Sequence, residues 1–174
     1  MSSTSSSRGN PSMGDILRSV SVLVLVVLAI WGFSKLFSQK PDSPTPSVDY
    51  ASTVKSARPA ADFPLLAPTS LPAAWKATSV RFSPQSWHLG VLTKAGNYIG
   101  LEQAKISVDR AVDEFAKGSK TAGTTRIGSQ TWELRKGPKD AITYVRAEAG
   151  LTTLVTGDAP RTVVENYVSS LSTS

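Results

Sequence analysis

The sequence has no cysteine among its 174 residues. This absence excludes disulfide bonds, thiolate metal sites, thiol nucleophiles and a lipid anchor attached through cysteine. The sequence also lacks a GxxxxGK[ST] phosphate-binding loop and a Gly-x-Ser-x-Gly nucleophile elbow. We therefore expect no cofactor, no metal ion and no enzymatic activity.

Positive charge is present but not concentrated. The formal net charge is +6, and it divides equally between residues 1–40 and the rest of the chain. No block of five or six like charges occurs, and the densest basic patch, Arg135, Lys136 and Lys139, flanks a Gly-Pro turn. Nucleic acid is therefore not an expected partner.

One long apolar run lies near the N-terminus. Residues 19–34 carry no charge, and Arg18 and Lys35 close the run at its two ends. Sixteen helical residues cover about 24 Å, less than the ~30 Å of a bilayer core. Snorkelling of the two basic side chains supplies the difference, and Trp31 suits the membrane interface. We predict an uncleaved transmembrane helix, a signal anchor, over residues 16–37.

Two other interpretations of this run fit the sequence less well. A cleaved signal peptide needs small residues at its cleavage site, and no Ala-x-Ala pattern follows the run. A buried core helix would connect to its domain by a short loop, whereas both flanks here are rich in serine and proline.

The chain is expected to divide into four parts. Residues 1–15 form a disordered tail, 16–37 the transmembrane helix, 38–47 a Pro/Ser-rich linker and 48–174 one folded domain. The balance of charges slightly favours a cytoplasmic N-terminus. We thus predict a single-pass protein of the cell membrane with an extracytoplasmic C-terminal domain.

The domain pattern predicts an α+β fold with a mainly antiparallel sheet of about six strands and helices packed on one face. The expected strands are residues 75–83, 87–93, 98–105, 125–136, 142–148 and 151–156. The expected helices are residues 48–57, 108–117 and a last one that begins near Pro160. In the second helix Ser107 is the N-cap, and its buried stripe contains Val108, Ala111, Val112 and Phe115.

One hairpin can be predicted to its register. A turn over residues 93–97, with Gly96 in the left-handed conformation, pairs Val91 with Ile99 and Leu89 with Leu101. The opposite face then carries Leu92 with Tyr98, Gly90 with Gly100, and His88 with Glu102. The same Ala-Gly device at residues 149–150 is expected to join the last two strands.

Several separate segments resemble one known family. They are FPLLAPTSLPAAWKATSVRFSP, WHLGVLT, YIGLEQA, GSQTW and LVTG. Together they are similar, in order, to an actinobacterial family defined as domain of unknown function 4245, from about Val48 to the C-terminus. The resemblance implies a membrane-associated protein of the cell envelope, and it implies no activity.

The predicted hairpin contains the candidate binding site. Two glycines directly opposite each other leave a bare patch of sheet that a ligand or partner could approach, unless a side chain such as Trp75 or Trp132 covers it. The candidate binding residues share the face of this patch: His88, Gly90, Leu92, Tyr98, Gly100 and Glu102.

Other polar side chains provide weaker candidates. His88 and Glu102 could act as an acid and a base, but the sequence offers them no nucleophile or third member, and such a pair is more often a plain cross-strand contact. Asp109, Asp113 and Glu114 are expected on the solvent face of their helix.

Three functions therefore stay open. The first is a non-enzymatic domain that binds an envelope protein or a small ligand, through the glycine patch or the proline-rich loop over residues 63–75. The second is an envelope enzyme that uses His88 and Glu102. The third is a structural subunit of a membrane complex. Membrane lipid is the expected partner of residues 16–37 in each case.

Overall fold

The computed structural model describes residues 14, 18, 20–28 and 47–173, and the chain divides into two compact units, residues 1–44 and 45–174. In the first unit residues 20–28 are helical. Among the described residues, no helix has both the length and the hydropathy that a membrane span requires. The remainder of the predicted span, tail and linker lies outside the described residues.

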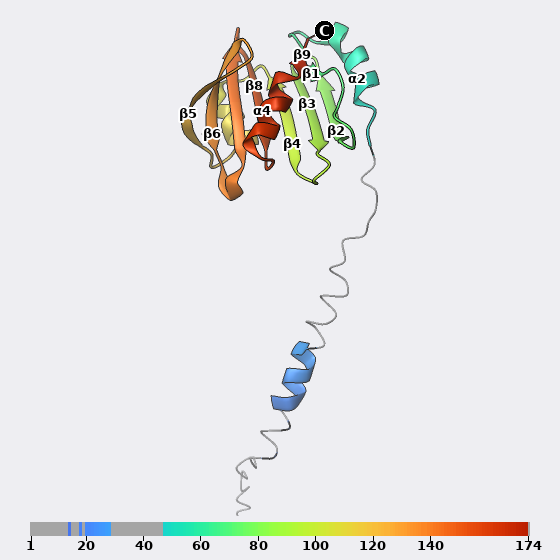
Figure 1. The fold of residues 1–174 in the computed structure, drawn as a ribbon, viewed down its shortest axis with the longest axis vertical. Helices are drawn as coiled ribbons and strands as arrows, with labels where there is room; N and C mark the ends of the chain where they lie inside the picture. The colour runs from blue at the N-terminus through green and yellow to red at the C-terminus, as the bar shows by residue number, and fades with distance from the viewer. Residues whose placement is uncertain (1–13, 15–17, 19, 29–46, 174) are drawn as a thin grey trace, which may run out of the picture. The chain divides into compact units, whose positions relative to one another are not determined.

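The second unit is built on a seven-stranded antiparallel sheet (Figure 1). Its spatial order is β2-β3-β4-β8-β7-β6-β5. The strands are β2 (Lys76–Ser83), β3 (Ser86–Leu92), β4 (Tyr98–Ala104), β5 (Lys120–Ile127), β6 (Gln130–Lys136), β7 (Ile142–Glu148) and β8 (Leu151–Gly157). A separate two-residue pair joins β1 (Ala67–Pro68) to β9 (Leu171–Ser172). The predicted α+β class is confirmed.

The predicted hairpin register is confirmed between β3 and β4. Leu89 pairs with Leu101, Gly90 with Gly100, and His88 with Glu102. Gly96 has φ +82 in the turn, the left-handed value that glycine adopts without strain.

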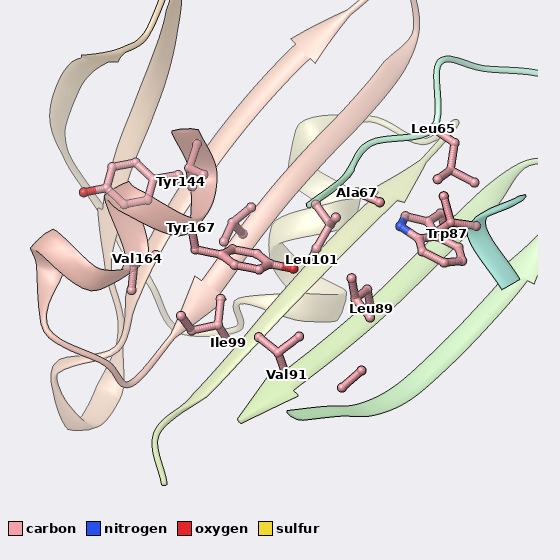
Figure 2. Close-up of a cluster of buried hydrophobic side chains, with 14 of the residues drawn as sticks. Leu65, Ala67, Trp87, Leu89, Val91, Ile99, Leu101, Tyr144, Val164 and Tyr167 are labelled. Carbon is pink, nitrogen blue, oxygen red and sulfur yellow. The ribbon is translucent and has the colours of Figure 1, made fainter. Parts of the chain in front are cut away.

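The two faces of the sheet carry different residues. The core face, on which Leu89, Leu101 and Val155 lie, holds the main hydrophobic cluster. Helices α2 (Tyr50–Ala57) and α4 (Arg161–Ser169) contribute Val54, Ala57, Val164, Tyr167 and Val168 to this cluster. Figure 2 shows Val164 and Tyr167 among the side chains of the strands. The opposite face, which we name the glycine face, carries Gly90, Gly100, His88 and Glu102.

The prediction that all helices pack on one face is wrong. Helix α3 (Val108–Phe115) lies on the glycine face, where Ala111 contacts Val145 and Leu154. Leu154 pairs directly with Glu102, so both point to the same face. The Ser107 cap and the apolar stripe of α3 are confirmed. An amphipathic stripe specifies that a helix is half-buried, but it does not specify which face of a sheet covers it.

The prediction of a single strand over residues 125–136 is also wrong. Gly128 and Ser129 form a two-residue turn between β5 and β6, with Ile127 paired to Gln130. Gly128 has φ +60, which fits a turn of type II′. The sheet therefore has seven strands instead of about six.

The Ala149-Gly150 turn joins β7 to β8, as predicted, but by a different device. Glu148 pairs with Leu151, so the loop has two residues. Both have positive φ, +49 at Ala149 and +79 at Gly150, as in a type I′ turn. The turn at residues 93–97 instead has a positive φ at Gly96 alone.

Gly157 offers a test of the packing at the end of β8. A β-carbon there would lie 2.8 Å from the Tyr98 carbonyl oxygen and 3.1 Å from Ile99 Cγ1. Since a backbone oxygen cannot move aside cheaply, Gly157→Ala should lower the free energy of unfolding by about 1–3 kcal/mol, measured by urea unfolding of the full chain in detergent. Gly137→Ala is the control, because its β-carbon would approach no atom closer than 3.4 Å. Equal unfolding midpoints for the two variants would contradict this packing.

Candidate functional site

The candidate site is a chain of polar side chains across three neighbouring strands of the glycine face. The register places Arg81 opposite His88 and Ser79 opposite Gly90 on β2 and β3. His88 in turn lies opposite Glu102 of β4. Ser79, His88 and Glu102 therefore share one face although they lie on separate strands.

A β-bulge determines the direction of Ser79. Ala77 pairs with Val91 and Ser79 with the adjacent Gly90, so Thr78 is the extra residue. Thr78 satisfies its hydroxyl by donating to the Gly90 carbonyl oxygen at 3.2 Å. Because a bulge shifts the alternation by one residue, Ala77 points to the core face and Ser79 to the glycine face.

His88 links the other two members of the chain. The Ser79 hydroxyl oxygen lies 2.7 Å from His88 Nε2, and His88 Nδ1 is hydrogen-bonded to Glu102 Oε1. The His88 and Glu102 side chains are only 9% and 14% exposed. An ionised carboxylate only accepts hydrogen bonds, so Nδ1 donates to Glu102. In the neutral ring Nε2 then accepts the Ser79 proton.

Tyr98 covers the two glycines. A β-carbon at Gly90 would lie 2.6 Å from the Tyr98 hydroxyl oxygen, and one at Gly100 would lie 3.2 Å from the same ring. The predicted bare patch is thus occupied, and neither of the tryptophans suggested for it is responsible. Trp75 stacks on Tyr167 with ring centroids 6.2 Å apart, and Trp132 lies under the Arg146 guanidinium at 5.4 Å.

Tyr98 adds a phenol hydroxyl to the polar side chains Ser79, His88 and Glu102. Burial raises the pKa of Tyr98, a hydrogen bond with Ser79 lowers it, the Glu102 charge raises it and the Arg81 charge lowers it. The raising effects exceed the lowering ones, so the pKa of Tyr98 lies above its ordinary value of 10. The hydroxyl is therefore protonated at neutral pH. Asp158 fixes the backbone of this residue, because its Oδ1 accepts from Tyr98 N at 2.6 Å.

A groove of about 590 Å³ lies next to the polar side chains His88 and Glu102, on the side of helix α3. His88 and Glu102 line it, together with Arg81 of β2 and Arg110 of α3. Among the described residues neither arginine forms an ion pair with a carboxylate. The groove is thus polar: besides the two guanidinium groups, two carboxylates, Glu102 and Glu114, line it.

The structure brings five of the six predicted site residues together. His88 and Glu102 line the groove, while Gly90, Gly100 and Tyr98 adjoin these two residues on the same face of the sheet. Leu92 pairs with Tyr98 but does not line the groove. Whether these residues bind a ligand stays a prediction.

Three residues of the site were missed from the sequence. Ser79 depends on the bulge, and the placement of Arg81 and Arg110 beside one groove depends on the face that α3 covers. Asp109, Asp113 and Glu114 are exposed, as predicted. Within the described part of the chain, no group of three or more possible metal ligands is found.

Comparison with known proteins gives one result. The model of a family described as a protein of unknown function (DUF4245) matches residues 8–171, nearly the whole chain. No curated protein and no solved structure matches the chain.

The charges around Tyr98 provide a direct test of the site geometry. Glu102→Gln should lower the pKa of Tyr98, because it removes a nearby negative charge, and Arg81→Gln should raise it. The pKa can be measured by NMR titration of tyrosine labelled with ¹³C at Cζ. Arg126→Gln, at an exposed position of β5, should leave it unchanged. A Tyr98 pKa that responds to neither substitution would show that the two charges do not face the ring.

Proposed function

The chain belongs to the DUF4245 family of proteins of unknown function, and from that premise we propose that it is a single-pass, membrane-anchored cell-envelope protein whose domain binds an anionic ligand. The ligand occupies the groove beside helix α3. The observation that carries this proposal is the pair of arginines, Arg81 and Arg110, on one groove without acidic partners.

Exposed apolar side chains support the anchor. On helical residues 20–28 the valines and leucines are each 50–65% exposed. Water-exposed apolar surface of this kind marks contact with lipid or protein, and the uncharged run of residues 19–34 continues it on both sides. The proposed anchor is residues 16–37, with the domain on the extracytoplasmic side.

The composition of the groove supports an anionic ligand. Its volume of about 590 Å³ falls within the ~300–1,000 Å³ of small-molecule sites. Guanidinium groups match carboxylates and phosphates with paired hydrogen bonds. Lys105 also lines the groove, although it lies 4.0 Å from Asp62. These three basic side chains face two carboxylates of the same lining, Glu102 and Glu114, so the balance of charge is positive.

The anchor can be tested by adding charge to it. Leu25→Lys with Val26→Lys places two ammonium groups in the apolar run, each of which costs roughly 2.5–3.5 kcal/mol at the centre of a membrane helix. The double variant should move from the carbonate-resistant membrane fraction to the soluble fraction. Ser5→Lys with Ser6→Lys is the control and should remain with the membrane. If the wild-type chain itself is recovered in the soluble fraction, the anchor is wrong.

The groove can be tested with phenyl phosphate as the probe. Titration into the full ¹⁵N-labelled chain in detergent should shift the amide signals of residues 81, 88, 102 and 110. Arg81→Gln with Arg110→Gln should weaken binding by more than about a hundredfold, because each of the two lost charge-assisted pairs contributes about 1.5–3 kcal/mol.

Arg126→Gln is the matched control for that titration, since it removes one exposed positive charge elsewhere. It should bind phenyl phosphate as the wild type does. Signal changes spread over the whole surface, or equal binding by the groove variant and the control, would rule out the groove as the anion site.

A further inference from the structure

The polar chain on the glycine face has the order of groups that activates a serine. A carboxylate (Glu102) holds one nitrogen of an imidazole (His88), and the other nitrogen lies 2.7 Å from a hydroxyl (Ser79). A nucleophile, a base within hydrogen-bonding reach and a third group that orients the base form the general signature of covalent catalysis. The pair predicted from the sequence lacked a nucleophile, and Ser79 is in place to be that member.

We propose that Ser79 is a nucleophile that accepts an acyl group from an ester substrate. His88 is its general base, and Glu102 orients His88. The nucleophile and its base are identified by the hydrogen bonds among Ser79, His88 and Glu102 and not by anion binding in the groove, so labelling and phenyl phosphate binding can give different results.

The reaction consumes only the ester and one water molecule. As Ser79 Oγ attacks the ester carbonyl carbon, its proton passes to His88 Nε2, and the carbonyl electron pair moves to its oxygen. When the tetrahedral intermediate collapses, the ester C–O bond breaks and the departing alcohol oxygen takes the proton from Nε2. Water then attacks the acyl group by the same route, which releases a carboxylic acid and restores Ser79.

The developing oxyanion needs donors, and side chains must supply them. The backbone N–H groups of β2 and β3 lie in the plane of the sheet, and those between the two strands are engaged in the ladder, so they do not point out of the glycine face. The Tyr98 hydroxyl and the Ser79 hydroxyl border the same space, 2.6 Å and 2.4 Å from the place of the missing Gly90 β-carbon, and burial raises the pKa of Tyr98, so its hydroxyl is protonated at neutral pH. Arg81, two residues further along the same face of β2, lies opposite His88 and carries a positive charge. These two groups stabilise the negative oxygen.

The immediate environment of Ser79 favours chemistry over a purely structural hydrogen bond. The bulge at Thr78 alone directs this hydroxyl to the glycine face, and bulges commonly re-aim side chains next to active sites. The residue opposite Ser79 is Gly90, and its missing side chain lets the Tyr98 hydroxyl come close to Ser79. Tyr98 is 36% exposed, so the site borders solvent with the ring in place.

A fluorophosphonate probe tests the proposal on the full chain in detergent. The activated hydroxyl attacks phosphorus, fluoride leaves, and the phosphonyl group stays on Ser79 as a mass increase in the peptide that contains it. Wild-type protein should label at Ser79, and Ser79→Ala should abolish labelling. Glu102→Gln and His88→Gln should slow labelling by roughly a hundredfold, which is the scale of general-base assistance.

Ser83→Ala is the matched control. Ser83 lies on the same strand as Ser79, and its hydroxyl contacts Ser86 at 2.7 Å instead of a base. The control should label at the wild-type rate. Circular dichroism of each variant verifies the fold, and Ser79→Ala decides the question even if His88→Gln does not fold.

Two results would overturn the proposal. One is a folded wild-type chain that the probe does not label. The other is labelling that persists in Ser79→Ala or is spread over several serines. Retained phenyl phosphate binding in an unlabelled chain would leave the binding function standing and remove only the nucleophile.

Discussion

The opposed glycines of β3 and β4 are the constraint on which the glycine face depends. With no β-carbon at Gly90 or Gly100, the Tyr98 ring lies directly against the sheet. Its hydroxyl thereby comes within hydrogen-bonding reach of Ser79. Larger residues at the glycines would push the ring away from Ser79. The close approach of Tyr98 to Ser79 is therefore a consequence of the missing side chains at two paired positions.

The hydrophobic core maintains this arrangement from the other side of the same strands. Leu89, Leu101 and Val155 are fully buried on the core face, and their neighbours along each strand point to the glycine face. A slip of one residue would exchange the two faces. The burial of the aliphatic residues thus specifies the register, and the register brings His88 opposite Glu102. The same aliphatic residues therefore stabilise the sheet and position the site.

The sequence predicted the parts of the site that depend on regular alternation. Turn chemistry at Gly96 and aliphatic pairing gave the β3–β4 register and the His88–Glu102 pair correctly. Ser79 could not be placed, because strict alternation along β2 puts it on the same face as Ala77. Only the bulge at Thr78 reverses this, and nothing in the local sequence requires a bulge.

Other errors arose where local signals were ambiguous or silent. Gly128-Ser129 is a two-residue turn of a common kind, but Thr125, Ile127 and Thr131 on its two sides are β-branched and favour a continuous strand. The apolar stripe of α3 was recognised, but the face that it covers is a tertiary choice. That choice places Arg110 on the same groove as Arg81. The family is described as one of unknown function, so the proposed functions are inferred from the geometry of the site.

Through its hydrogen bond, Glu102 holds the proton of His88 on Nδ1 and leaves Nε2 to accept a hydrogen bond from Ser79. Long-range ¹H–¹⁵N NMR of the imidazole distinguishes the two ring nitrogens and therefore tests this arrangement. We expect the neutral ring to carry its proton on Nδ1, and we expect this tautomer to be lost in a Glu102→Leu variant. A neutral ring protonated on Nε2 in the wild-type chain would contradict this arrangement.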